Sequence, residues 1–491
     1  MKPKRNSLGK NALLNVIKQI CSILFPIITF PYASRILGTV GYGKVNFSHS
    51  IISYMSLIAG LGITNYAIRE GSRVRNDKQK LQKLANEVYT INIVSTFVSY
   101  IGLFALIIFW RRMDNYAALM LIQSMSVLFT TIGTDWINSI YEDYRYITIR
   151  YIVCHIISLA LMFLLVRTEQ DYIFYAFTSV SSTIVANFLN IKYIRKKYCI
   201  FPRISFSRGC LTHVKPILIM FGTAIASLVY INSDITILGV LQDDKTVGLY
   251  SASTKIYSLV KQLMNATLIV AIPRISYEIT NNKKEEVSKH LTEIFGNVLI
   301  IIGAACAGLF MLSTNIIYLF SGIEFIEAAS SLKILSVALI FATSACFYIT
   351  VILVPYKNEK IALYASIISA SVNIVFNFIL IPIMGKDAAA LTTLISELIM
   401  AGIGFLYSKK IVQLQLTRSL IIGFINAVIT VVVCSGVKLF IVNNVLIILL
   451  SIILSVLCCT SVLLAAYKEK FSSVIHKIKH YANMLSTPYQ D

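Results

Sequence analysis

Fourteen apolar stretches of about 20 residues each restrict the fold of this chain more than any other feature. A helix of about 20 residues crosses a hydrocarbon core roughly 30 Å thick. A membrane β-barrel would instead show short segments of alternating polarity, which these stretches lack. Of the 491 residues, 57% are hydrophobic and 14% charged, so the sequence predicts an all-α, polytopic membrane protein. The predicted spans are 13–36, 45–67, 86–109, 116–138, 147–166, 172–193, 216–240, 248–272, 291–312, 332–354, 361–383, 387–407, 419–440 and 445–467.

The distribution of positive charge predicts how the chain is oriented. The formal net charge is +21, and 31 of the 44 lysines and arginines fall in alternate connections if both termini are cytoplasmic. Only six fall in the outer connections, and seven lie within spans. Cytoplasmic loops of membrane proteins carry such an excess, so we expect a multi-pass membrane protein with both ends in the cytoplasm. The basic loops are then topology determinants beside anionic lipid, and no nucleic-acid partner is expected.

A long basic loop and a weak internal repeat predict two lobes. The segment Ile36-Leu37-Gly38 is similar to Ile237-Leu238-Gly239, about 200 residues later, and a polar span follows each. Parallel repeats of this kind build many transporters, which hold substrate between the halves near the midplane. The predicted parts are an N-terminal lobe of six helices (1–193), a cytoplasmic linker (194–215), a C-terminal lobe of six helices (216–407), two extra helices (408–467) and a cytoplasmic amphipathic tail (468–491).

Two spans carry polar stripes that contain positive charge. Lys18 and Arg35 belong to the first span, and Lys255 and Lys261 belong to the eighth. A charge at the bilayer centre costs about 2.5–3.5 kcal/mol on insertion scales, so such residues usually face a polar cavity. The stripes therefore predict a central cationic cavity that binds substrate through these four residues. Its predicted polar lining is Asn15, Gln19, Ser22, Thr254, Ser258, Gln262, Asn265, Asn373 and Asn377.

Carboxylates within the spans are candidates for ion coupling. Asp234, Glu397 and Asp135 lie in or at the edges of apolar stretches, where such groups often bind a proton or a sodium ion. Structural ion pairs are the alternative interpretation. Arg35 lies close enough to a span end to extend toward the lipid headgroups, and the polar stripes could serve only interhelical hydrogen bonding.

Several kinds of chemistry have no signature in the sequence. There is no P-loop for a nucleotide, and the nine cysteines have no metal-binding spacing. No nucleophile and base can be paired by spacing, and the outer loops are short. We therefore expect no cofactor, no metal and no catalysis.

Several short segments between about residue 9 and residue 407 carry a family resemblance, and those near the N-terminus are the most specific. These segments are Asn11–Asn15, Phe25–Gly38, Gly41–Phe47, Gly62–Glu70, Asp135-Trp136, Val247–Ser251, Ile272–Ser276, Gly322–Phe325 and Asn373–Pro382. They resemble the bacterial O-antigen flippases, the polysaccharide branch of the multidrug/oligosaccharidyl-lipid/polysaccharide exporter superfamily.

The resemblance implies two six-helix lobes plus two helices in the bacterial cytoplasmic membrane. It also implies transfer of an undecaprenyl-pyrophosphate-linked oligosaccharide from the inner to the outer leaflet. It also implies that the chain operates beside a polysaccharide polymerase and a chain-length regulator. Lysines and arginine suit a pyrophosphate, whereas Ser, Asn and Gln suit sugar hydroxyls. Three alternatives stay open: a cation-coupled multidrug exporter of the same superfamily, a polysaccharide polymerase or ligase, and a scaffold for the assembly complex.

Overall fold

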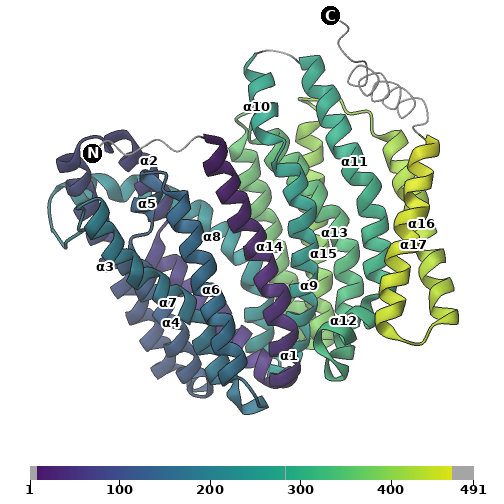
Figure 1. The fold of residues 1–491 in the computed structure, drawn as a ribbon, viewed down its shortest axis with the longest axis horizontal. Coiled ribbons are helices and arrows are strands. Elements are labelled where there is room, and N and C mark those ends of the chain that lie inside the picture. Colours follow the sequence, from purple (N-terminus) through teal and green to yellow (C-terminus); the bar gives the residue numbers. More distant parts are fainter. Residues whose placement is uncertain (1–7, 282–283, 467–491) are drawn as a thin grey trace, which may run out of the picture. The chain divides into compact units, whose positions relative to one another are not determined.

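The computed structural model describes residues 8–281 and 284–466, and this part of the chain is helical with no strand (Figure 1). The predicted amphipathic tail at 468–491 lies outside the described residues. The helices are α1 (Leu8–Gly60), α2 (Ile63–Val74), α3 (Lys78–Phe109), η1 (Arg111–Tyr116), α4 (Ala117–Gly133), α5 (Trp136–Ile140), α6 (Tyr144–Leu165), η2 (Glu169–Asp171), α7 (Tyr172–Lys197), α8 (Gly209–Leu241), α9 (Asp244–Ile269), α10 (Ile272–Thr280), α11 (Lys284–Met311), α12 (Ser313–Ser321), η3 (Ile323–Ala328), α13 (Ala329–Ala345), the π-helix η4 (Cys346–Leu353), α14 (Glu359–Met384), α15 (Lys386–Ser408), α16 (Thr417–Phe440) and α17 (Asn444–Ala466).

These helices accommodate about fourteen crossings, which confirms the predicted fold class. Twelve helical segments of the described chain are long and apolar enough to span a membrane. One of them contains α1, which has 53 residues and is long enough for two crossings at 1.5 Å per residue. Helix α8 supplies one further crossing, since it contains two shorter apolar parts at Gly209–Gly222 and Ile231–Leu241.

The first two spans join more tightly than the sequence predicts. We expect a loop at 37–44, but the helix is interrupted at a single residue, Gly38, with φ 63° and ψ −178°. Positive φ is strained for side chains other than glycine. One glycine therefore replaces the predicted loop, and the second helical part of α1 begins immediately after it.

The chain forms two compact units. Unit 1 contains Met1–Lys255, Phe320–Ser331 and Leu363–Ser396, and unit 2 contains Ile256–Leu319, Leu332–Ala362 and Glu397–Asp491. Helices α9, α14 and α15 each contribute residues to both units. The lobe boundary at 194–215 stays a prediction.

In unit 1, α1 packs against α3, α4, α6 and α8, and α7 packs against α4 and α6. Glycines allow the closest approaches, because a Cβ atom on Gly239 of α8 would overlap the ring of Phe47. Such small residues are common where membrane helices touch. The packing of unit 1 therefore depends on particular small residues as well as on apolar surface.

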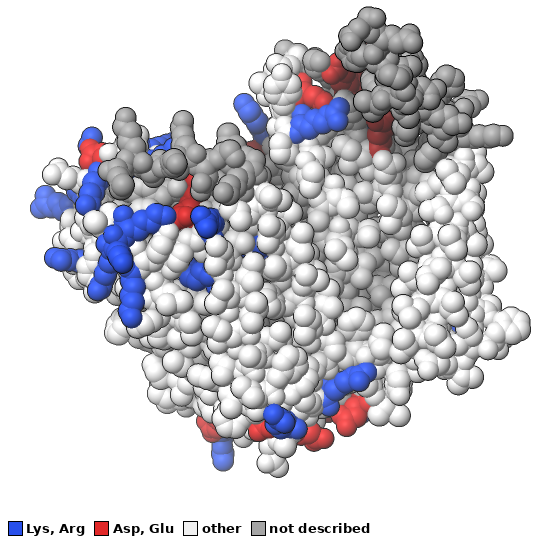
Figure 2. Space-filling model, viewed as in Figure 1, with Lys and Arg blue, Asp and Glu red and all other residues white. Residues whose placement is uncertain are grey.

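In unit 2, α11 packs along α16, and α17 also packs against α16. A Cβ atom on Gly303 would overlap the backbone of Gly423, so these helices touch through their main chains. The ring of Phe295 stacks on that of Phe347 in the π-helix η4 at 3.9 Å. On the face that Figure 2 shows, charged side chains gather near the two ends of the helices, and the surface between them is mostly uncharged, as in a membrane protein.

Candidate functional site

The first half of α1 exposes two chemically different faces. Asn15, Gln19 and Ser22 are exposed on one side, while Ile20 and Leu24 are about half exposed on another. An apolar exposed face suits lipid, whereas an exposed polar face within a span suits a water-filled cavity. The predicted polar stripe on α1 is therefore accessible in the structure.

Lys18 lies at the edge of this polar stripe, against α6. Its Nζ atom is 5.7 Å from the centre of the Tyr151 ring, which in turn lies 3.9 Å from the His155 ring. Phe25 completes the group, 5.1 Å from His155. Lys18 is partly buried and has an aromatic neighbour, whose negative ring face attracts a cation.

Helix α9 carries the second stripe, and its two lysines have different surroundings. Lys261 Nζ lies 2.5 Å from Oε1 of Glu397, whose side chain is 3% exposed. Tyr257 donates a longer hydrogen bond of 3.4 Å to the same oxygen. Lys255 is partly buried, and it has no acidic partner among the residues that the structure describes. Its electrostatic neighbour is His49 of α1, which is exposed.

The other predicted lining residues of α9 differ in access. Thr254 and Ser258 are partly buried, and Gln262 is exposed. Thr254 bonds to backbone carbonyls of its own helix. The side-chain oxygen of Asn265 is buried without a hydrogen-bond partner among the described residues.

Asp234 is the centre of a buried polar network in unit 1. Its Oδ2 accepts hydrogen bonds from Tyr250 at 2.7 Å and Thr393 at 2.6 Å. Its Oδ1 accepts one from the amide of Asn377 at 2.7 Å. The side-chain oxygen of Asn373 accepts from the same amide at 3.0 Å. The structure thus joins Asp234, Asn373 and Asn377, three predicted residues from distant parts of the sequence.

The donors that the described residues contribute to this network are neutral. Thr392 donates to the side-chain oxygen of Asn377 at 2.5 Å, and Ser233 donates to that of Asn373 at 2.7 Å. The Tyr250 hydroxyl also lies 3.4 Å from the backbone oxygen of Ala389. Several oxygen atoms therefore surround a buried carboxylate, which is the ligand type that hard cations prefer.

Arg35 lies near the end of the first half of α1, and Asp135 lies immediately before α5. Arg35 is exposed in the last turn before Gly38, and its Cγ atom is next to Gly322. Asp135 receives a bond of 2.6 Å from the buried Arg150 and one of 2.9 Å from Asn138. Asp135 therefore belongs to an ion pair at the junction of α4, α5 and α6.

The segment 199–207, here called the strap, is more ordered than a linker. Gln82 of α3 exchanges two hydrogen bonds with the backbone of Phe201. Asn86 then accepts from the backbone nitrogen of Arg203 at 3.0 Å, and Thr90 accepts from that of Ser205 at 2.8 Å. The bonding residues are four apart on α3, which is a rise of about 6 Å along a helix. They are two apart on the strap, which is about 6.6 Å along an extended chain. The hydrogen-bonding groups of α3 and the strap therefore have nearly the same spacing.

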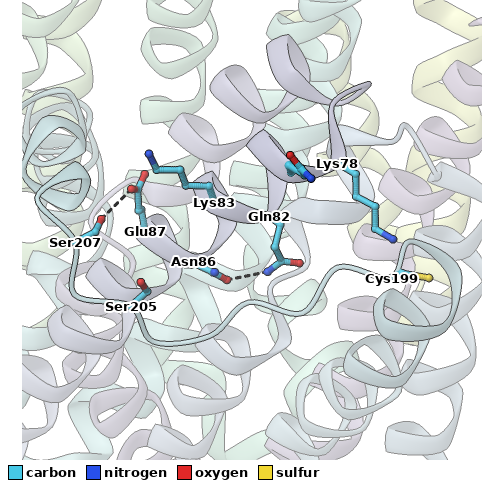
Figure 3. A pocket seen from close by; sticks show the side chains of 9 residues that line it. Lys78, Gln82, Lys83, Asn86, Glu87, Cys199, Ser205 and Ser207 are labelled. Carbon is cyan, nitrogen blue, oxygen red and sulfur yellow. Dashed lines mark hydrogen bonds between the residues drawn. The ribbon is translucent and has the colours of Figure 1, made fainter.

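The strap and α3 enclose a groove of about 500 Å³ (Figure 3). At one end Glu87 accepts a hydrogen bond of 2.9 Å from Ser207. It also pairs with His213 of α8 at 3.0 Å, and His213 contacts the hydroxyl of Tyr66 at 2.6 Å. The sequence analysis predicted neither the cluster around Glu87 nor the row of hydrogen bonds between α3 and the strap. The regular spacing of the polar residues at positions 82, 86 and 90, on one face of α3, is the signal that could have indicated this row of bonds.

Comparisons with known proteins agree with this architecture. The family model "Polysaccharide biosynthesis protein" matches residues 8–279, and the MatE model matches residues 219–379. A protein of Escherichia coli (strain K12) named "Putative O-antigen transporter" is 24% identical over 423 residues, which cover 84% of this chain and 99% of the relative. A protein of Shigella dysenteriae with the same name is 22% identical and covers 79% of this chain and 97% of the relative.

Solved structures show the same fold. A structure titled "Lipid II flippase MurJ, inward closed conformation" matches with a TM-score of 0.73 and 18% identity, covering 94% of this chain and 100% of that one. An inward-facing multidrug resistance MATE family transporter of the MOP superfamily matches with a TM-score of 0.62 and 14% identity. That match covers 79% of this chain and 97% of the MATE chain. At these identities the likeness concerns the fold alone.

Proposed function

Because this chain belongs to the family of polysaccharide biosynthesis proteins, whose model it matches over residues 8–279, we propose that it flips undecaprenyl-pyrophosphate-linked repeat units of O-antigen or a similar polysaccharide. Transfer would run from the inner to the outer leaflet of the cytoplasmic membrane by alternating access. The O-antigen transporter names of its relatives support this substrate class. A polymerase and a chain-length regulator would act on the product outside.

One observation carries the proposal: Lys255 is a partly buried cation on a polar helix face, with no acidic partner in the described chain. Burying an ammonium without a counter-ion is costly, and a pyrophosphate would supply the missing charge. Lys18 adds a second cation beside the polar stripe of α1. The hydroxyl and amide side chains of both stripes offer hydrogen-bond partners for sugars.

Asp234 is the proposed coupling carboxylate. Its partners are neutral donors, so a proton or a monovalent cation would compensate its charge. Oxygen atoms of Asn373, Asn377, Thr393 and Ala389 lie in the same network and would complete the coordination. Glu397 and Asp135 already have basic partners, which favours a structural role for both.

The membrane potential supplies part of the driving force. Moving one charge across 100 mV changes the free energy by about 2.3 kcal/mol. A substrate with two negative charges that crosses the full field outward would gain about twice that amount. The same potential would drive a coupling cation inward, so inward movement of the cation in exchange for substrate would add to this gain.

The test is leaflet transfer in proteoliposomes. We would incorporate a fluorescent undecaprenyl-pyrophosphate oligosaccharide, add an outer-face quencher and impose a potential. We expect transfer by the wild type and a fall of about tenfold in Lys255→Ala. The matched control is Lys245→Ala, since Lys245 is an exposed lysine of the same helix whose partner Glu327 is also exposed. No transfer by the wild type with several glycans would contradict the proposal.

The second candidate is a cation-coupled multidrug exporter, which the MatE match over residues 219–379 favours. Such a protein would bind organic cations, so uncompensated lysine would be unfavourable in its cavity. Efflux of a fluorescent organic cation from the same proteoliposomes, improved by Lys255→Ala, would support this alternative.

A further inference from the structure

The strap lies against the face of α3 that is exposed along the rest of the helix. Polar residues at positions 82, 86 and 90 hold the strap near the start of α3. At 3.6 residues per turn, these positions share one face with four large apolar residues further along the helix, each about half exposed or more. These four are Phe97, Ile101, Phe104 and Ile108. Such side chains within a span suit lipid, so the strap covers one end of a lipid-facing surface.

Hydrogen bonds to α3 allow a segment that is not helical to lie beside lipid. Backbone N–H and C=O groups without partners are costly in hydrocarbon, because no water is there to bond them. The side chains of Gln82, Asn86 and Thr90 accept hydrogen bonds from alternate backbone nitrogens of the strap. Gln82 and Thr90 also donate to the carbonyl oxygens of Phe201 and Ser205. Helix α3 therefore provides partners that water would otherwise supply.

The side chains of the strap differ in polarity between its two sides. Ser205 and Ser207 line the groove beside α3 (Figure 3). Ile204 and Phe206 are exposed, and Phe206 is exposed by 82%. This alternation is expected of an extended chain, whose neighbouring side chains point to opposite sides. Leu211, just after the strap, is 74% exposed. Exposed phenylalanine and leucine beside basic residues are typical of segments that bind at a bilayer surface.

The charge around the strap is entirely positive. Residues 192–215 contain seven lysines and arginines and no aspartate or glutamate. Arg203 and Arg208 are exposed. The guanidinium of Arg195, near the end of α7, lies 3.7 Å from the centre of the Phe201 ring, and that of Arg203 lies 5.8 Å from it. The predicted orientation places this surface at the cytoplasmic leaflet, where anionic lipids attract lysine and arginine.

We propose that the strap is a binding surface for anionic phospholipids of the inner leaflet. Phe206 and Leu211 enter the boundary between headgroups and acyl chains, while Arg203 and Arg208 bind the lipid phosphates. The bonds to α3 hold the strap in this position. The inference concerns the lipid around the protein, so it goes beyond the proposed transport function and does not depend on the transported substrate.

An indole at position 206 tests where the strap lies. We would introduce Phe206→Trp into the full-length chain and reconstitute it in vesicles of phosphatidylcholine and phosphatidylglycerol. Bromine on the acyl chains quenches indole fluorescence at short range. After subtraction of the signal of the wild type, which has two tryptophans, we expect the added indole to be quenched by brominated lipid and shielded from aqueous iodide. Quenching by iodide alone, or by neither, would overturn the proposal.

Two sets of vesicles with the same composition test the preference for anionic lipid. In one set the phosphatidylglycerol is brominated, and in the other an equal amount of the phosphatidylcholine is brominated. We expect the brominated phosphatidylglycerol to quench more strongly, corresponding to an enrichment of about threefold at the strap. Equal quenching by the two lipids would overturn the proposal.

Two arginine variants, each carrying Phe206→Trp, test the source of this preference. Arg203→Gln/Arg208→Gln should abolish the enrichment. The matched control is Arg111→Gln/Arg167→Gln, which removes two exposed arginines of unit 1 from the predicted outer side and should leave the enrichment unchanged. Thermal melting would confirm that both variants are folded. An enrichment that persists in folded Arg203→Gln/Arg208→Gln would overturn the proposal. The assay contains no oligosaccharide, so its outcome is independent of leaflet transfer.

Discussion

Asp234 and Glu397 are both buried carboxylates in membrane-spanning helices, but the charges of their partners differ. Asp234 accepts hydrogen bonds from Tyr250, Thr393 and Asn377, all neutral. Glu397 faces the ammonium of Lys261 at 2.5 Å. A carboxylate among neutral donors still attracts a cation or a proton, whereas one beside a lysine is already compensated. The difference separates a candidate coupling group from a structural ion pair, which their similar settings in the sequence could not do.

The largest effect should come from Asp234→Asn. The amide keeps the size of the side chain but removes the negative charge, so we expect transfer to fall at least tenfold, or about 1.4 kcal/mol in activation free energy. We also expect the wild type to melt at higher temperature when its coupling cation is added, because a bound ligand stabilises the folded state. Melting curves in sodium, lithium and choline salts check this. A sodium-dependent shift that persists in Asp234→Asn would place the cation elsewhere.

Glu397→Gln should act mainly on stability. Breaking a buried ion pair costs about 3–5 kcal/mol, and Lys261 keeps 27% of its side chain exposed, so we expect a loss of about 2–3 kcal/mol. In Glu397→Gln the ammonium of Lys261 is left without its partner. Removing that charge as well, in the double variant Lys261→Gln/Glu397→Gln, should restore most of the lost stability. Thermal melting of the three variants measures this. A double variant as unstable as the single one would show that the pair is not the source of the loss.

Lys18→Gln should have a smaller effect on transfer than replacement of Lys255. The ring of Tyr151 already attracts the Lys18 ammonium, and such a contact contributes about 0.5–2 kcal/mol. We expect transfer to fall about threefold, against about tenfold for Lys255→Gln. Initial rates in the proteoliposome assay compare the two. Equal losses would mean that the aromatic neighbour does not reduce the contribution of Lys18.

Asp143, which lies outside the spans, is intermediate between Asp234 and Glu397, because it accepts hydrogen bonds from both a charged and a neutral kind of donor. Burial alone would raise the pKa of Asp143, but hydrogen bonds from Lys197, Tyr193 and Tyr198 outweigh it and hold the pKa below its usual value. The stabilising contribution is therefore complete above the pKa of an unfolded aspartate, near 3.9, and is lost as pH falls through the lower folded value. Melting temperature below pH 4 should drop less steeply in Asp143→Asn than in the wild type.

The sequence predicted well those features that depend on short stretches of chain. The apolar lengths predicted about fourteen crossings, and α1, α9 and the other long helices supply them. The lysine stripe on α9 was also visible from its spacing. The gap between the first two spans was overestimated, because one glycine with positive φ at position 38 is sufficient to interrupt the helix.

The partners of the charged residues could not be predicted in the same way. Lys261 and Glu397 are 136 residues apart, and Asp234 and Asn377 are 143 apart. Spacing alone made Asp234, Glu397 and Asp135 equivalent candidates for ion coupling. Only the packed helices show that two of them have basic partners, with Arg150 beside Asp135, while the third has neutral donors.

By itself, the sequence determined that the chain crosses a membrane many times and that positive charge lies within some of its spans. Both follow from local rules, since hydrocarbon excludes polar backbone and each span must satisfy its own hydrogen bonds. The tertiary structure decided which cations are compensated, how the strap is fixed to α3, and where two helices touch through glycine. These depend on distances of a few ångströms between residues far apart in the chain, because electrostatic and hydrogen-bond energies fall steeply over that range.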